Sequence, residues 1–390
     1  MKLLIYSHFF PPSVGGVETV VLALAYGLAG ERRPEGTLEF EITLVTATPP
    51  GEFQEADLPF RVVRQPTMLQ FRQLVQNSDV VHVAGAAIPP IALGLFAGKP
   101  VVVEHHGFQT ICPTGQLFQE PQNVPCPGHF AAGHHAACLR CSSKPQRIAS
   151  FRLWLLTFLR RFLCQRVAVN ITPTTWLATQ LQLPRTESVP HGLPIVPFTQ
   201  PQAHARATPV IVFMGRIVTT KGLGVLLEAA RILIQQNRLF ELRIIGDGPE
   251  RVSLEKFAHQ LALDSHVQFL GRVPQARVPE ILAQTDLVVV PSLGGEVFGM
   301  VVAENMLRGL TVVASNLGAF QELLGNTGVT FRTGNAADLA VQLGKLLDDP
   351  ANSRHLGAAA RQRVLEFFTL GRMIAAHAEI YRRIVPRKGF

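Results

Sequence analysis

The chain of 390 residues has few charged side chains, few aromatic side chains and only five cysteines. Charged residues make up 16% of it and aromatic residues 7%, while hydrophobic residues reach 47%, a balance that excludes a disordered or low-complexity chain. No stretch approaches the roughly 18 uninterrupted apolar residues of a membrane-spanning helix, so we expect no span. A chain of this length can bury two ordinary cores, and two domains are therefore expected.

The N-terminal apolar run, Leu3–Tyr6, is too short for an export signal and is followed by Phe9-Phe10-Pro11-Pro12 rather than by small residues. We interpret it as a first β-strand and expect a cytoplasmic protein. In a reducing compartment, metal binding or burial is the expected state of the cysteines, rather than disulfides.

Acidic residues are absent from residues 121–186, although the whole chain carries a formal net charge of +8. The eight basic residues there are Arg140, Lys144, Arg147, Arg152, Arg160, Arg161, Arg166 and Arg185. Such a field favours an anionic lipid surface, a diphosphate-linked acceptor or nucleic acid, and a solvated basic face is the alternative. Residues 151–163 mix bulky apolar residues with arginines, which is typical of a helix at a membrane interface or of a core helix with a basic edge.

Short apolar runs alternate with helical patterns in both halves of the chain, which indicates βαβ units and parallel sheets. The first half predicts strands at 3–6, 40–45, 80–83 and 101–104 and a helix at 18–29. The second half predicts strands at 210–215, 242–246, 267–271, 287–290 and 311–314 and a helix at 224–236. Residues 193–209, rich in proline and lacking periodicity, predict a linker, and 370–384 predict a final helix.

The first βα turn carries Gly15 and Gly16, which let the backbone approach a phosphate at a helix N-terminus. Its spacing differs from the dinucleotide-binding Gly-x-Gly-x-x-Gly pattern, and a simple tight turn is the alternative. In the second half, Arg216 and Lys221 follow a strand at the edge where ligands bind open α/β sheets. Two cations there would neutralise a diphosphate leaving group, unless they are only surface cations.

Glu296 and Glu304 lie eight residues apart after the strand 287–290. A helix that begins near Phe298 would have Glu296 just before it and Glu304 about two turns into it, with free N–H groups at its start. One carboxylate can then face a sugar and the other a ribose.

Four cysteines, Cys112, Cys126, Cys138 and Cys141, include one Cys-x2-Cys pair and can supply a closed thiolate site for structural zinc. Cys164, on an apolar helical face, is expected to be buried and inert.

These motifs together resemble glycosyltransferase family 4, a large family of retaining enzymes with the GT-B fold. The resemblance rests on Gly215-Arg216-x4-Lys221-Gly222, Gly246-Asp-Gly-Pro-Glu250, Phe269-Leu-Gly271-Arg-Val273-Pro, Pro291-Ser with Glu296-x7-Glu304, Gly15-Gly16-Val-Glu, and Val103-Glu-His-His106-Gly-Phe-x3-Cys112-Pro. It implies an α/β architecture with two Rossmann-like parallel-sheet domains that face a central cleft. The implied boundaries are 1–195, with a cysteine-bearing insertion at about 108–147, then 208–368, and a helix at 369–390 that crosses back to the first domain.

The resemblance also implies roles for individual residues. Arg216 and Lys221 would bind the donor diphosphate, and Gly15 and Gly16 would lie beside it. Glu304 would bind the ribose and Glu296 the transferred sugar, while His106 would lie beside the anomeric centre. Phosphate or sugar oxygens would be bound by the amides of Phe298, Gly299, Met300 and Val301, and the base would lie near Gly271 and Val273. Counting back from Cys112 selects His106 over His105. Where the family often has Val-x-Asn-Gly-Val-Asp, this chain has Val189-Pro-His191-Gly-Leu-Pro, which leaves the role of His191 open.

The implied activity is the metal-independent, retaining transfer of a sugar from a UDP-, GDP- or ADP-sugar to a glycan, lipid-linked or small-molecule acceptor. No cofactor is expected for catalysis and no specific nucleic acid is expected as a partner. Peripheral association with an anionic membrane surface is expected instead. The alternatives are a nucleotide-sugar 2-epimerase of the same fold and a non-catalytic module that binds anionic lipid or nucleic acid.

Overall fold

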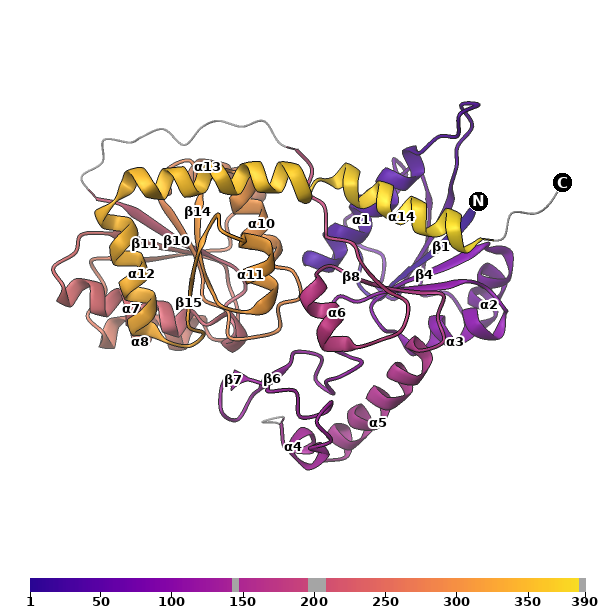
Figure 1. Ribbon diagram of the computed structural model, residues 1–390, viewed down its shortest axis with the longest axis horizontal. Helices are drawn as coiled ribbons and strands as arrows, with labels where there is room; N and C mark the ends of the chain where they lie inside the picture. The colour runs from indigo at the N-terminus through magenta and orange to yellow at the C-terminus, as the bar shows by residue number, and fades with distance from the viewer. Residues whose placement is uncertain (142–146, 196–207, 386–390) are drawn as a thin grey trace. The chain divides into compact units, whose positions relative to one another are not determined.

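A computed structural model describes residues 1–141, 147–195 and 208–385 (Figure 1). Lys144 and residues 196–207 of the predicted linker lie outside the described residues. The chain divides into two units. The N-terminal unit comprises Met1–Gln116, Gly128–Pro194 and Phe368–Phe390, and the C-terminal unit comprises Leu117–Pro127 and Ile195–Phe367.

The N-terminal unit is built on a seven-stranded parallel sheet with the order β3-β2-β1-β4-β5-β8-β9. Its strands are β1 Lys2–Ser7, β2 Glu41–Thr46, β3 Arg61–Arg64, β4 Val80–Ala84, β5 Val101–Glu104, β8 Val169–Thr172 and β9 Thr186–Ser188. Its helices are α1 Gly16–Gly30, α2 Met68–Asn77, α3 Ile88–Phe96, α4 His135–Leu139, α5 Arg147–Cys164, α6 Thr175–Leu181 and α14 Leu370–Ile384. The central strands are buried along their whole length because helices cover both faces of a parallel sheet.

The C-terminal unit is built on a six-stranded parallel sheet with the order β12-β11-β10-β13-β14-β15. Its strands are β10 Val210–Met214, β11 Glu241–Ile245, β12 Val267–Gly271, β13 Leu287–Val290, β14 Thr311–Ser315 and β15 Val329–Phe331. Its helices are η1 Thr219–Lys221, α7 Leu223–Gln235, α8 Arg251–Gln260, η2 Gln275–Arg277, α9 Val278–Leu282, α10 Met300–Leu307, α11 Gly318–Leu324, α12 Ala336–Asp348 and α13 Pro350–Phe367. Leucines of α7 and α12 form the main core against this sheet.

Numbered within each sheet, the strands follow the Rossmann order 3-2-1-4-5-6, and the N-terminal sheet adds a seventh strand at its edge. The predicted α/β class with two Rossmann-like parallel-sheet domains is confirmed. One segment lies elsewhere than expected from the chain order. The short hairpin of β6 Phe118–Gln119 and β7 Val124–Pro125 is grouped with the C-terminal unit, where Phe118 packs beside Gly294.

The last helix of the chain, α14, packs on α1 within the N-terminal unit (Figure 1). Gly27 of α1 makes this approach close, since a Cβ atom there would lie only 2.0 Å from Cδ1 of Ile374. Tyr381, about three turns into α14, is completely buried and contacts His82 of β4. Residues near the C-terminus thus complete the core around the central strands.

Candidate functional site

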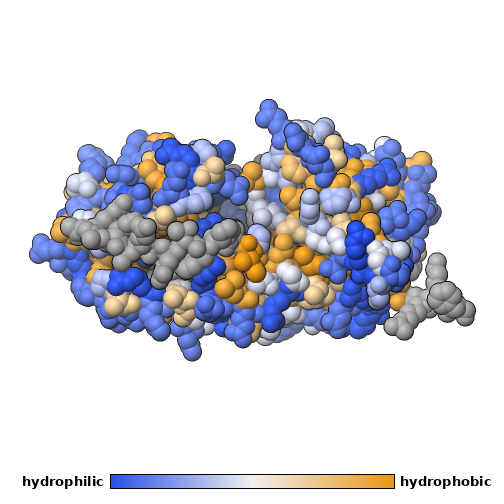
Figure 2. Space-filling model, turned by 90° about the horizontal axis from the view of Figure 1, so that it is seen from above, coloured by the Kyte–Doolittle hydropathy of each residue, from blue (hydrophilic) through white to orange (hydrophobic). Residues whose placement is uncertain are grey.

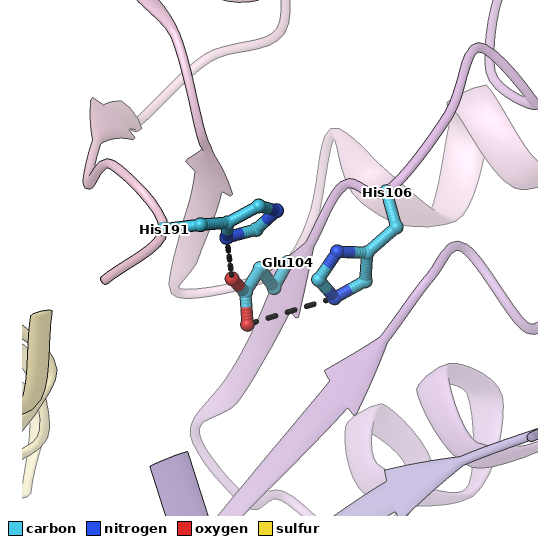
Figure 3. Close-up of side chains that lie close together, drawn as sticks. All are labelled: Glu104, His106 and His191. Carbon is cyan, nitrogen blue, oxygen red and sulfur yellow. Dashed lines mark ion pairs between the residues drawn. The ribbon is translucent and has the colours of Figure 1, made fainter. Parts of the chain in front are cut away.

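Strand β5 ends at Glu104, whose side chain is completely buried among imidazoles. Its Oε2 atom lies 3.2 Å from Nε2 of His82, 3.6 Å from Nε2 of His377 and 3.7 Å from Nε2 of His106. Its Oε1 atom lies 3.5 Å from Nδ1 of His191. In Figure 3, one oxygen of the carboxylate faces the ring of His191 and the other faces the ring of His106. A buried carboxylate needs compensation of this kind, because transfer of a charge from water is costly.

Different elements bring these histidines together. His82 lies on β4, which pairs with β5, and His106 comes two residues after β5. His191 follows β9, while His377 lies on α14. Tyr381, also on α14, has its hydroxyl 2.9 Å from Nδ1 of His82. The carboxyl end of a parallel sheet and the returning helix therefore assemble the cluster.

Burial dominates the ionisation of the cluster. It lowers the pKa values of His82 and His106 and lowers that of His191 to about 3. Burial by itself raises the pKa of Glu104, but the neighbouring histidines, led by His106, outweigh it and hold that pKa well below its usual range. The result is an anionic carboxylate among imidazoles that favour their neutral form.

His105 and His106 point to different partners. Nε2 of His105 donates to Oδ1 of Asn170 on β8 at 2.9 Å, and Asn170 in turn donates to the carbonyls of Cys164 and Pro184. Burial lowers the pKa of His105 to about 4. His105 is therefore part of the core, and His106 is the member of the pair that joins the Glu104 cluster.

The turn before α1 has Gly15 as the residue that caps the helix and Gly16 as its first residue. The carboxylate of Glu18 lies over this turn, accepts a hydrogen bond of 2.8 Å from Oγ of Ser13, and fills the space that a Cβ atom of Gly15 would need. A phosphate at this helix end would lie close to that carboxylate.

In the C-terminal unit, loops after β10, β11 and β13 meet backbone to backbone. Gly222 has φ +67, and a Cβ atom there would lie 2.0 Å from the carbonyl oxygen of Pro291. Gly246 has φ +137, and a Cβ atom there would lie about as close to the carbonyl oxygen of Gly215. Only glycine therefore fits both positions. These close backbone contacts need glycine, and they bring the loops after three strands together.

Lys221 and Glu296 form a direct pair at this edge. Nζ of Lys221 lies 2.5 Å from Oε1 of Glu296, and Oγ of Ser292 donates to the same oxygen at 2.8 Å. Arg216, two residues after β10, is exposed. The structure therefore brings together Lys221 and Glu296, for which separate contacts to diphosphate and sugar were predicted, and leaves Arg216 facing solvent.

Helix α10 begins at Met300, two residues after the predicted start near Phe298. Gly299 precedes it with a left-handed backbone conformation (φ 104). A right-handed helix cannot include a residue in that conformation, so α10 does not start earlier. Glu304 consequently lies about one turn into the helix, not two, and burial raises its pKa. The side chain of Phe298 is buried, and the backbone N–H groups of Met300 and Val301 stand at the first turn.

Gly271 ends β12 with φ +67, and its carbonyl accepts a hydrogen bond of 2.8 Å from the amide of Gly246. Val273 is half-buried in the loop that follows. These two positions therefore lie at the same sheet edge as Lys221 and Glu296.

The cysteines are spread over both units. Cys112 and Cys138 are buried in the N-terminal unit, as Cys141 partly is, whereas Cys126 belongs to the hairpin grouped with the C-terminal unit. Over residues 1–141, 147–195 and 208–385, the one group of three or more side chains with ligand atoms within 4.8 Å of one another is Glu104, His106 and His191. The zinc site at Cys112, Cys126, Cys138 and Cys141 stays a prediction. Cys164 is buried, which raises the pKa of its thiol to about 12.

Helix α5 exposes a row of large apolar side chains. They are Ile148, Phe151, Leu153, Leu155, Phe158, Leu159 and Phe162. Arg152 is exposed beside them, but Arg160 and Arg161 are only partly exposed, and Nη1 of Arg161 donates to the carbonyl of Leu181 at 2.7 Å. The helix thus combines exposed apolar side chains, of which Phe158 also packs on Phe130 and His135, with cations, some of which have structural partners.

No helix in the described part of the chain is long and apolar enough to cross a membrane. On the face of the molecule shown in Figure 2, hydrophilic residues are interspersed with smaller hydrophobic groups.

Comparison with known proteins gives three findings. Residues 198–363 match the family model described as glycosyl transferases group 1. A phosphatidyl-myo-inositol mannosyltransferase of Mycolicibacterium smegmatis is 32% identical over 205 residues, which are 51% of this chain and 52% of that protein. The GDP-mannose-dependent alpha-(1-6)-phosphatidylinositol monomannoside mannosyltransferase of the same organism is 25% identical over 402 residues, which are 93% of this chain and 94% of that protein.

The match to the first of these relatives spans about half of its length. Among solved structures, Anabaena HepE in complex with UDP has a TM-score of 0.75 at 18% sequence identity, and the match covers 98% of this chain and 100% of that chain. At this identity the likeness is one of fold.

Proposed function

We propose that this chain is a retaining glycosyltransferase, because residues 198–363 match the family model of glycosyl transferases group 1 and the chain has the GT-B fold. It transfers a sugar from a nucleotide-diphosphate sugar to a glycan, lipid-linked or small-molecule acceptor. The observation that carries the proposal is the edge of the C-terminal sheet, where Arg216, the Lys221–Glu296 pair and the first turn of α10 follow neighbouring strands. Cations, a carboxylate and free N–H groups are what a nucleotide-diphosphate sugar requires.

In the proposed reaction, the bond between the anomeric carbon and the diphosphate oxygen breaks, and the acceptor oxygen bonds to the same face of that carbon. The proton of the acceptor hydroxyl passes to the departing diphosphate oxygen. Arg216 and Lys221 stabilise the charge that develops on the leaving group, with the N-terminus of α10, so that no catalytic metal is required. Glu296 stabilises positive charge on the sugar.

The ion pair gives Lys221 and Glu296 a defined arrangement before the donor arrives. Oε1 of Glu296 already accepts from Lys221 and from Ser292, which fixes the side chain in one orientation. A preorganised carboxylate stabilises a developing charge without a reorganisation cost during the reaction. Glu304, held in a less polar environment one turn into α10, binds the ribose hydroxyls.

We infer a lipid-linked acceptor and a peripheral position on the cytoplasmic face of an anionic membrane from helix α5. Its exposed phenylalanines and leucines can enter the headgroup region, while Arg152 contacts anionic headgroups. The two mannosyltransferases named above act, by their names, on phosphatidylinositol-based lipids, which supports the same class of acceptor here. The donor is a UDP-, GDP- or ADP-sugar.

A donor screen tests the proposal. The thermal unfolding midpoint is measured with UDP-, GDP- and ADP-sugars, because a donor at about 100 times its Kd stabilises the fold by about 2.7 kcal/mol. Arg216→Ala should abolish the shift, whereas Arg354→Ala, an exposed arginine on α13, should keep it. Transfer to candidate acceptors is then followed by NMR of the product, in which retention gives the anomeric configuration of the donor.

Three results would contradict the proposal. They are the absence of any donor-induced shift, a product of inverted configuration, and donor consumption without acceptor to give an epimerised sugar nucleotide. Loss of transfer on brief addition of a chelator would contradict metal independence alone.

A further inference from the structure

The cluster around Glu104 has a feature that an ordinary hydrogen-bonded network lacks. Of the four imidazole nitrogens that face Glu104 in the described part of the chain, only Nε2 of His82, at 3.2 Å, lies within hydrogen-bond range of its oxygens. The distances of 3.5 to 3.7 Å to His191, His377 and His106 are longer than the roughly 2.7 to 3.2 Å of N–H···O bonds. Buried polar atoms that converge without bonding require an explanation.

The charge of the cluster is also uncompensated. Every ion pair of Glu104 among the described residues is with a histidine, and none is with lysine or arginine. His377 shows the problem most clearly, since its Nδ1 lies 2.8 Å from the carbonyl oxygen of Met373 and must donate to it. In a neutral ring, Nε2 is then a bare lone pair, and it faces Oε2 of Glu104. A positive charge among these atoms would compensate the buried carboxylate.

We propose that Glu104, His106 and His191 bind one divalent transition-metal ion of the zinc class. Their ligand atoms lie within 4.8 Å of one another, and two imidazoles with one carboxylate form a donor set that such ions prefer. Metal–ligand bonds of about 2.0 to 2.1 Å at tetrahedral angles separate ligand atoms by about 3.3 Å, close to the spacings found here. The ring centroids of His106 and His191, 5.2 Å apart, also suit two imidazoles on one ion.

His82 would not bind the ion itself but would contact its ligand Glu104. Its Nε2 atom is the closest to Glu104, at 3.2 Å, and for this nitrogen to donate, Nδ1 must accept from the hydroxyl of Tyr381. A fixed tautomer beyond the ligands orients a ligating carboxylate and increases its affinity for the metal. The ion would join the end of β5 to the loop after β9 and fix the ring of His106.

Metal analysis combined with X-ray absorption tests the proposal, which does not depend on the proposed transfer reaction. Full-length protein, stripped by chelator and dialysed against Zn²⁺, should retain an ion with nitrogen and oxygen neighbours at about 2.0 to 2.1 Å. Glu104→Gln and His191→Ala should lose this ion. The control His259→Ala, which removes an exposed histidine paired with Asp264, should keep it.

Circular dichroism reports whether the variants fold, and the absorption spectrum of the wild type decides the question if they do not. A sulfur shell at about 2.3 Å would assign the zinc to the cysteines and overturn the proposal. No retained zinc, or zinc that both variants retain, would overturn it as well. The donor-induced thermal shift is a separate measurement and would be unaffected by that outcome.

Discussion

Two carboxylates on the carboxyl side of strands, one in each sheet, have opposite environments. Glu104 ends β5, is completely buried and is surrounded by histidines from four elements. Glu296 follows β13, stays partly exposed and pairs with a lysine whose side chain reaches solvent. The first arrangement is closed and serves the structure of the N-terminal unit. The second can exchange its partner when a ligand arrives, which is why we assign chemistry to it.

The largest expected effect comes from a substitution of the partly exposed carboxylate, Glu296. Glu296→Gln keeps the shape but removes negative charge near a sugar that becomes positively charged in the transition state, so kcat should fall by roughly two to three orders of magnitude. Steady-state kinetics with an identified donor and acceptor measure it. Glu255→Gln, which breaks the exposed pair of Glu255 with Arg251, is the control and should keep kcat. Near-normal kcat in Glu296→Gln would remove this carboxylate from the reacting sugar.

A smaller effect is expected from Glu304, and it separates the role of Glu304 from that of Glu296. Glu304→Gln should raise the donor KM about tenfold with little change in kcat, because a ribose contact is made equally in ground and transition states. Burial raises the pKa of Glu304, so its charge is lost at a higher pH than for an exposed glutamate as the pH falls. The donor KM should therefore rise on acidification in the wild type and not in Glu304→Gln. A kcat effect as large as that of Glu296→Gln would refute the separate roles.

A substitution in the buried Glu104 cluster should lower the stability of the protein. Tyr381→Phe removes the hydroxyl beside Nδ1 of His82 and leaves a buried nitrogen unsatisfied, which costs about 1 to 3 kcal/mol of the free energy of unfolding. Urea denaturation measures this loss. Tyr26→Phe, at an exposed position of α1, is the matched control. An unchanged unfolding free energy would mean that the hydroxyl does not support the cluster.

The smallest expected effect concerns the surface of the N-terminal unit. Arg152→Glu should weaken binding to anionic vesicles by about tenfold, since each cation near such a surface contributes about 1 kcal/mol. Vesicle co-sedimentation at two salt concentrations measures it, with Arg354→Glu as the control. Arg160 and Arg161 are poor targets because both are partly buried. Equal binding to neutral and anionic vesicles would contradict the electrostatic contribution.

Much of the fold could be predicted from the sequence because the central strands are continuous apolar runs. Residues 101–104 and 287–290 were predicted with the bounds that the structure has, as was the last helix, 370–384. The edge strands β3 and β9 were missed because they are short and carry arginine, threonine and serine, which give no apolar signal. Chain order also misassigned the hairpin that contains Phe118, since grouping depends on contacts with residues far along the sequence.

The candidate site divides in the same way. Arg216, Lys221 and Glu296 could be found because local spacing after a strand carries the signal. Glu104 and His82 gave a weaker signal, which is a charged or polar residue within an apolar run. The contribution of Tyr381 could not be predicted at all, since its partner His82 lies 299 residues earlier in the chain.

The return of α14 to the first sheet has a consequence for how the polypeptide acquires its structure during synthesis. The C-terminal unit is complete once residue 367 has left the ribosome, although its chain is made later. The N-terminal unit, synthesised first, must wait for α14 to cover His82 and Glu104. Vectorial folding therefore runs against the order of translation here, and a nascent chain exposes the polar centre of its first domain until the last helix emerges.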